Sequence, residues 1–385
     1  DKTMNIPAKF DAIRPYEPEE LPQVYDKLLQ HEQFQQVLAY LYPQVPLEAI
    51  AAKMRTCTTN LEFQKAFCYG FLNQLLQKMS KGCDIDIRAI DPGCRYTFIS
   101  NHRDIVLDSA LLDKLLIDAG FDTTCEIAIG DNLLKLPWVK DLVRVNKSFV
   151  VERGLPMREM LMASKRLSEY MHFVIDEKHD NIWIAQREGR AKDSNDRTQE
   201  AILKMMVMGG EGSVVERLRQ LHIVPLAISY EFDPCDYLKA QEFQLRRDNA
   251  GWKKGPMDDI ISMQTGIMGY KGRIHYHCAP CIDEYLAQID PATPKTELFG
   301  MIAAHIDHEI HSNYRLYPNN YVALDLLHGT ADHTSQYTAE DKAVFTQYIE
   351  GQMAKISLPN RDDAYLKERM LTMYANPAIN YLAAQ

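Results

Sequence analysis

Seven short segments between residues 83 and 280 carry the β pattern, in which apolar residues alternate with polar ones or run together briefly. In chain order they are CDIDIRAI, YTFIS, CEIAIG, SFVVE, NIWIA, HIVPLAIS and GRIHYHCAP. Loops or stretches with the helical period separate them. Strands that alternate with helices are typical of an α/β fold, because parallel strands need crossover connections. We therefore expect a mixed, largely parallel sheet flanked by helices.

The first 82 residues lack this β pattern and predict helices alone. Apolar residues recur at helical spacing there, Pro43 and Pro46 separate two helices, and Thr59 can cap a third. After the last β segment the pattern becomes helical again near residues 281–313, 339–355 and 362–374. We expect a small helical N-terminal domain, residues 1–82, before an α/β domain, residues 83–385, whose C-terminal region is helical.

Charge and cysteine usage narrow the class of protein. The 53 acidic and 43 basic residues give a net charge of −10, which argues against nucleic acid as a partner. No apolar run has the length of a membrane span, and the start DKTMNIPAKFD lacks the regions of a signal peptide. Eight scattered cysteines are too sparse for a disulfide framework. We expect a cytoplasmic protein with free, buried thiols.

Polar side chains follow the strand YTFIS at its carboxyl end, where α/β sheets place their sites. His102, Asp104 and Asp108 stand there, before an apolar helix. A carboxylate can hold an imidazole in one tautomer and stabilise its charged form, which suits a general base near neutral pH. The alternative interpretation is a capped helix start with a structural histidine.

Three cations follow the strand NIWIA: Arg187, Arg190 and Lys192, around Gly189. Glycine lets the backbone approach a ligand, and phosphate suits such a group of cations. Residues 135–197 hold 13 basic and 10 acidic residues, so positive charge gathers here in an acidic chain. The loop is either an anion site or a solvated basic turn.

Two groups of histidines raise the question of a metal. They are His275 and His277 with Cys278 and Cys281, and His305, His308 and His311. A structural zinc site usually has four ligands, whereas the first group has one cysteine pair within a predicted strand. The second lacks the four-residue spacing of helical zinc enzymes. We expect no metal site. Glycine-rich phosphate loops and a serine nucleophile elbow are also absent from the sequence.

Five segments in their order resemble successive blocks of the glycerolipid acyltransferase superfamily. They are ISNHRDIVLD, AIGDNLLKLPWVKDLVRVNKSFVVERG, PMREM, IWIAQREGRAK and HIVPLAISYE. The superfamily includes glycerol-3-phosphate and 1-acylglycerol-3-phosphate acyltransferases, and this chain looks most similar to the soluble plastid-type glycerol-3-phosphate enzymes. The resemblance implies transfer of a fatty acyl group from a thioester to a hydroxyl of glycerol 3-phosphate, in phospholipid biosynthesis. It also implies a helical domain before the α/β domain.

The resemblance implies that His102 is the catalytic base. The family's aspartate stands five positions after that histidine, where this chain has Leu107. The nearest carboxylates are Asp104 and Asp108, and we favour Asp108, with a one-residue insertion.

The same resemblance implies that Arg153, Arg190 and Lys192 bind the substrate phosphate. Glu188 and Gly189 complete this site loop and stand in place of two glycines of the plastid branch. Arginine can bind phosphate with two donors, whereas lysine acts as a point charge.

Acyl-coenzyme A or acyl carrier protein is the implied co-substrate, with no other cofactor. The implied acceptor is glycerol 3-phosphate or a lysophospholipid, with peripheral contact at the inner membrane surface. Two alternatives stay open: an acyltransferase acting on lysophosphatidate or another lipid hydroxyl, and a catalytically silent module that binds lipid or acyl carrier protein.

Overall fold

A seven-stranded sheet forms the centre of the computed structural model, which describes residues 4–385. The strand order is β1-β7-β6-β2-β5-β3-β4. The strands are β1 (Cys83–Asp86), β2 (Thr97–Ser100), β3 (Cys125–Gly130), β4 (Ser148–Val151), β5 (Asn181–Ala185), β6 (Ile223–Tyr230) and β7 (Ile274–Cys278). Each neighbouring pair is parallel except β6 with β7. The mixed, largely parallel sheet predicted from the seven segments is confirmed.

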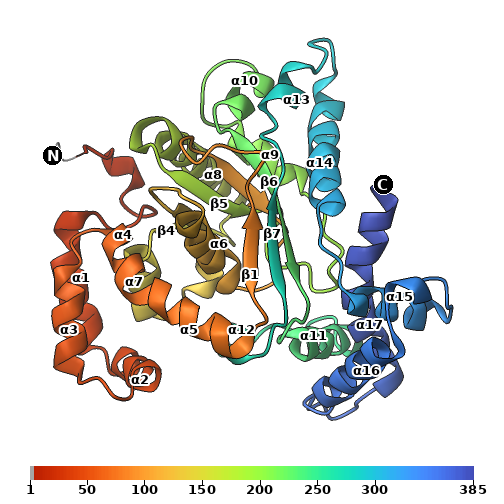
Figure 1. Cartoon of the computed structure of the whole chain (residues 1–385). Coiled ribbons are helices and arrows are strands. Elements are labelled where there is room, and N and C mark those ends of the chain that lie inside the picture. Colours follow the sequence, from red (N-terminus) through yellow and green to blue (C-terminus); the bar gives the residue numbers. More distant parts are fainter. Residues whose placement is uncertain (1–3) are drawn as a thin grey trace.

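Helices surround this sheet (Figure 1). Before it come α1 (Leu21–Gln30), α2 (Glu32–Leu41), α3 (Leu47–Thr56), α4 (Asn60–Phe63), the π-helix η3 (Gln64–Tyr69) and α5 (Gly70–Met79). Among the strands lie α6 (Leu107–Asp118), α7 (Pro137–Val145), α8 (Met157–Phe173), α9 (Glu200–Met206), α10 (Val214–Arg219), α11 (Asp236–Asp248) and α12 (Asp258–Met268). After β7 come α13 (Asp283–Ala287), α14 (Lys295–Ser312), α15 (Pro318–His328), α16 (Ala339–Met353) and α17 (Asp363–Ala383).

Strand direction gives the sheet two chemically different edges. Strands β2 to β6 all point the same way, whereas β7 and β1 point the opposite way. The carboxyl ends of β2 to β6 therefore meet at one edge, called the carboxyl edge below. The opposite edge, called the amino edge, receives the starts of these strands together with the end of β7.

Different helices cover the two faces of the sheet. Neighbouring residues of β2, Phe98 and Ile99, belong to separate buried clusters because successive side chains of a strand point to opposite faces. Ile99 packs with α8, α9 and α14, and Phe98 packs with α5 and α6. Burial on both faces explains why the central strands are continuously apolar.

Two further helical clusters lie at the ends of the sheet. Figure 1 shows α1 to α3 on one side of the molecule and α15 to α17 on the other. The N-terminal cluster includes Tyr25, Ile50 and also Val145 of α7, so these helices pack directly on the α/β part. The C-terminal cluster buries Phe345 of α16 and other residues of α11, α15 and α17.

The C-terminal helices differ from the predicted ranges. The stretch 281–313 is two helices, α13 and α14, and α15 has no counterpart in the prediction. Helix α17 runs past Pro377, beyond the predicted end at residue 374. Tertiary bonds hold its last turns: Asn376 donates to the carbonyl of Asp193 (2.7 Å), and Asn380 accepts from Arg197 (3.1 Å). These contacts outweigh the helix-breaking tendency of proline.

No helix within residues 4–385 is both long and apolar enough to cross a membrane. All eight cysteines are free, as expected, but Cys94 is exposed and three others are only half-buried.

Replacing Leu112 by alanine tests the central packing. Leu112 lies on α6 and is fully buried against the sheet. We expect Leu112→Ala to lower the free energy of unfolding by about 2–5 kcal/mol, because it leaves a cavity in the core. Chemical denaturation followed by circular dichroism measures this. Leu161→Ala, at a position of α8 that is 59% exposed, is the control, and an equal loss there would contradict the packing argument.

Candidate active site

The turn after β2 is fixed to the neighbouring strand by a buried asparagine. The side-chain amide of Asn101 donates to the carbonyl of Ile228 in β6 at 2.9 Å. Its oxygen accepts from the N–H of the same residue at 2.8 Å. These two hydrogen bonds extend the pairing of β2 with β6, so the backbone of the next residue, His102, is held in place at the carboxyl edge.

His102 and Asp108 form a hydrogen-bonded pair. His102 Nδ1 lies 2.6 Å from Asp108 Oδ2, and the first turn of α6 supplies the aspartate. The side chain of Asp108 is fully buried and that of His102 is 11% exposed. With Nδ1 bonded to the carboxylate, Nε2 is the ring atom left to accept a proton. This is the geometry of a general base oriented by a carboxylate.

Three further donors reach Asp108. The backbone N–H groups of Arg103 and Asp104 donate to Oδ2 at 2.7 and 3.1 Å, and the hydroxyl of Tyr230 donates to Oδ1 at 2.9 Å. Burial alone raises the pKa of Asp108, but the bonds from His102 and the two N–H groups outweigh it, and the pKa lies below its ordinary value. The carboxylate is therefore charged and held in place.

Asp104 lies beside this pair but faces the helix start. Its Oδ1 accepts from the N–H groups of Val106 and Leu107 at 3.0 and 2.8 Å. Gly266 of α12 packs against it so closely that a Cβ there would lie 2.1 Å from Oδ2. Burial, and then the charge of Asp108, raise the pKa of Asp104. Of the two predicted carboxylates, the structure places Asp108 against His102 and uses Asp104 to close the turn.

A buried ion pair holds the same turn from the other side. Arg103 donates two hydrogen bonds to Asp196, at 2.7 and 2.6 Å, and Tyr314 also donates to this carboxylate. The side chains of Arg103 and Asp196 are 8% and 1% exposed. Sequence analysis missed both residues and also Tyr230, because no local pattern links positions so far apart in the chain.

The predicted cations come to the same edge from two other strands. Arg153 follows β4 and lies across the end of β3, where a Cβ on Gly130 would fall 2.6 Å from its Nε. Its guanidinium pairs with Glu188 of the loop after β5 at 3.1 Å. The next residue, Gly189, has φ of 73°, a left-handed conformation that favours glycine and turns this loop.

Arg190 is 7% exposed, yet it makes no hydrogen bond or ion pair within residues 4–385. None of its nitrogens is a fully buried atom without a partner, so the guanidinium reaches the cavity and is available to an anion there. Lys192 lies nearby and pairs with Glu242 at 3.0 Å. Burial lowers the pKa of Lys192 to about 8, although Glu242 opposes that shift.

One cavity of about 490 Å³ joins these groups. His102, Arg153, Glu188, Gly189, Arg190 and Lys192 line it together. Its aliphatic lining comes mainly from β3, α7 and β4: Ile127, Ile129, Val139, Val143 and Val151. Lys254, a lining cation of the loop before α12, gave no signal in the sequence. The cavity thus combines a carboxylate-paired histidine, several cations and an apolar recess.

The histidines considered for a metal have other neighbours. His275 and His277 of β7 lie 2.8 and 3.7 Å from Asp84 and Asp86 of the paired strand β1. His305 stacks on Tyr285, with ring centroids 3.7 Å apart. None of these three histidines lines the cavity.

Residues 86–229 match the family model described as Acyltransferase. Among solved structures, the chain is similar to the crystal structure of the 1-acyl-sn-glycerophosphate (LPA) acyltransferase PlsC from Thermotoga maritima. That match has 12% sequence identity and a TM-score of 0.37, and covers 75% of this chain and 92% of that chain. No curated protein matches the sequence. The matched segment, residues 86–229, includes His102, Asp108, Arg153 and Arg190.

Proposed function

We propose that the chain is an O-acyltransferase that moves a fatty acyl group from an acyl thioester to a hydroxyl of glycerol 3-phosphate, in phospholipid biosynthesis. One observation carries the proposal: His102, which is paired with Asp108, and the unpartnered Arg190 line a single cavity with an apolar recess. An acceptor with a phosphate at one end and a hydroxyl at the other matches this combination.

His102 acts as the general base. Nε2 takes the proton of the acceptor hydroxyl while its oxygen attacks the thioester carbonyl. The new C–O bond forms, the C–S bond breaks, and the leaving thiolate takes the proton back from His102. Asp108 stabilises the imidazolium between these two transfers, and the protein is never acylated. A positioned base contributes about 10²- to 10⁴-fold to the rate.

The cations orient the acceptor by its phosphate. Arg190 supplies an unpaired fork of donors, and Arg153 and Lys192 add charge at the same wall. Holding the phosphate fixes the hydroxyl near His102, so that the attack becomes effectively unimolecular. Acyl-coenzyme A or acyl carrier protein is the proposed donor, and we propose no other cofactor.

The apolar recess suits the acyl chain, and α8 connects it to the surface. Met160 and Leu167 of this helix line the cavity, whereas Met157, Leu161 and Met162 are 83%, 59% and 69% exposed. An exposed apolar strip beside a cavity is typical of a lipid-contacting surface. This arrangement supports peripheral contact with a membrane, from which the product lipid can leave.

Product analysis separates the candidate functions. The purified chain is incubated with glycerol 3-phosphate or lysophosphatidate, each with palmitoyl thioesters of coenzyme A and of acyl carrier protein, and products are resolved by mass. Acylated glycerol 3-phosphate supports the proposal and identifies the donor. Product from lysophosphatidate alone makes the second acylation step the function. Absence of both products favours the silent binding module.

Replacing His102 by alanine tests the base. We expect His102→Ala to lower kcat by about 10²- to 10⁴-fold with little change in KM for the phosphate substrate, because only proton transfer is lost. Steady-state kinetics measure both constants. His308→Ala, an exposed histidine outside the cavity, is the matched control. Unchanged transfer by the His102 variant would remove the proposed base.

Sulfate binding tests the anion site without turnover. We expect Arg190→Gln to weaken sulfate binding by about 10- to 100-fold, the loss of a charge-assisted hydrogen bond to a buried site. Isothermal titration calorimetry measures this. Arg187→Gln removes a half-buried cation from the same wall and should have the smaller effect. Equal effects would mean that charge alone, not the position of Arg190, sets the affinity.

The pKa of Lys192 predicts a pH dependence of the same binding. Because that pKa is about 8, Lys192 is positive below it and neutral above it, whereas sulfate keeps its charge. We expect sulfate affinity to fall as the pH rises through about 8. Lys192→Arg, which keeps its charge, should flatten the profile, and a flat profile in the wild type would contradict the assignment.

A further inference from the structure

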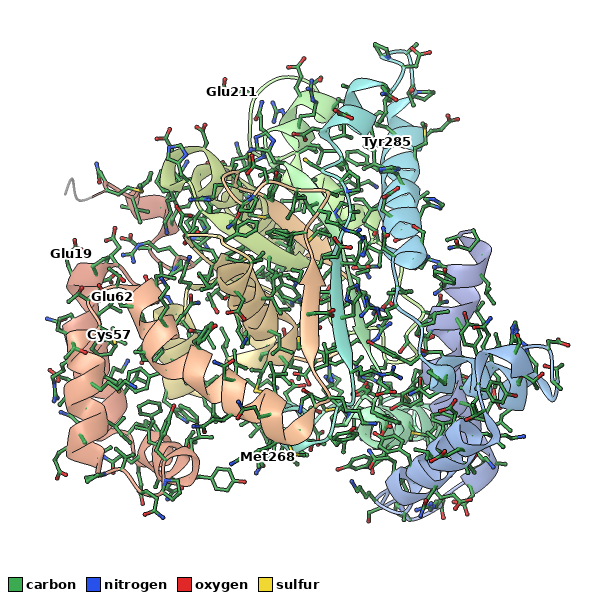
Figure 2. All side chains as sticks on the ribbon, viewed as in Figure 1. Glu19, Cys57, Glu62, Glu211, Met268 and Tyr285 are labelled. Atoms are coloured by element: carbon green, nitrogen blue, oxygen red, sulfur yellow. The ribbon has the colours of Figure 1, made fainter. Side chains whose placement is uncertain are left out.

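A second cluster of ligating side chains lies at the amino edge, opposite the acyltransferase cavity. His222 directly precedes β6, and Cys281 and Asp283 follow β7, which ends at this edge because it runs antiparallel to β6. One ligand atom from each residue falls within 4.8 Å of the others. In Figure 2, Glu211 and Tyr285 mark this end of the molecule, and Met268 marks the opposite end.

One carboxylate oxygen of Asp283 in this cluster has no hydrogen-bond partner within residues 4–385. Its Oδ2 lies 2.6 Å from His222 Nδ1, but its Oδ1 is buried and has no hydrogen-bond partner within residues 4–385. A buried carboxylate oxygen without a donor carries a desolvation penalty. A cation next to Cys281 and His222 would remove that penalty.

Cys281 and Cys278 have different surroundings. Cys278 is the last residue of β7 and is fully buried in the core, so the two cysteines considered in the sequence do not form one site. Cys281 is half-buried and faces a separate cavity, which His222, Asp283 and the exposed Cys94 also line. The structure thus gives Cys281 a histidine from a distant segment, His222, beside the nearby carboxylate of Asp283.

We propose that His222, Cys281 and Asp283 bind a zinc ion. Imidazole nitrogen, thiolate sulfur and carboxylate oxygen are the ligands that zinc takes, whereas magnesium and calcium prefer oxygen alone. The thiolate and the carboxylate neutralise the charge of the ion. Zinc bonds of about 2.0–2.3 Å in a tetrahedron separate ligand atoms by about 3.5 Å, so small side-chain rotations close the cluster. The fourth position is left to water from the cavity.

Three protein ligands and one water form a zinc site with an open position, unlike the four-ligand structural sites considered in the sequence. The ion would also cross-link two segments of the chain. It would add a link between the turn before β6 and the beginning of α13, which already meet through the Ile282 N–H bond to the Ile223 carbonyl (2.9 Å) and the His222–Asp283 pair. Arg219 of α10 is the cation whose charge acts on His222. Because Arg219 is exposed, solvent screens that charge. The proposed zinc site is independent of the acyl transfer.

Cobalt(II) tests the site by spectroscopy. The full chain, reduced and stripped of metal, is titrated with cobalt(II), whose thiolate charge-transfer band reports a sulfur–metal bond, and zinc(II) then displaces it in competition with a chelator. We expect one ion per chain and no charge-transfer band in Cys281→Ser. His222→Gln and Asp283→Asn should weaken zinc binding by more than the about 10- to 100-fold typical of losing an outer-sphere partner.

Two neighbouring thiols serve as matched controls. Cys94→Ser, in the same cavity, and Cys278→Ser, buried in the core, should both keep the band. Zinc should also raise the Tm of the wild type and not of Cys281→Ser, with far-ultraviolet circular dichroism showing that each variant is folded. Absence of the band in the wild type, its persistence in Cys281→Ser or its loss in Cys94→Ser would overturn the proposal. If Cys281→Ser does not fold, unchanged zinc affinity in both His222→Gln and Asp283→Asn would overturn the proposal.

Discussion

Asp108 is a charged carboxylate without solvent contact, and the geometry around it follows from the donors that such a group requires. Two donors are backbone N–H groups of the turn after β2, one is the ring of His102, and one is the hydroxyl of Tyr230. Tyr230 can reach it because β6 pairs with β2 in the sheet. The fold of the turn, the direction of the histidine ring and the strand order are thus one connected arrangement.

Two arginines at the same edge, Arg103 and Arg190, differ in whether they have a partner. Arg103 is buried but paired with Asp196, which makes it part of the framework. Arg190 has no partner within residues 4–385 and lines the cavity, so its guanidinium stays available, which is the reason for the proposed phosphate role. Arg153 stands two residues after β4 and Arg190 stands in the loop five residues after β5. The Arg153–Glu188 ion pair joins these two segments.

Strand direction decides which residues lie at each edge of the sheet, and the residues at the two edges differ in chemistry. Parallel strands deliver their carboxyl ends to one edge, where the base and the cations gather. The single antiparallel pairing, of β6 with β7, sends residues 281 and 283 to the other edge, beside His222. A chain with seven parallel strands would place them elsewhere. The topology therefore separates the catalytic cavity from the proposed zinc site.

Local periodicity in the sequence was enough to locate all seven strands, because burial on one or both faces leaves its pattern in consecutive residues. The position of His102 and its nearest carboxylates, and the cations after β5, also follow from segments that end at one edge, whereas only the family resemblance indicated Arg153. The partners of Arg103, Tyr230 and Cys281 lie tens of residues away, and α17 continues through Pro377 because of contacts with the loop after β5. Only the tertiary structure decides such pairings, since they depend on which distant segments share a buried space.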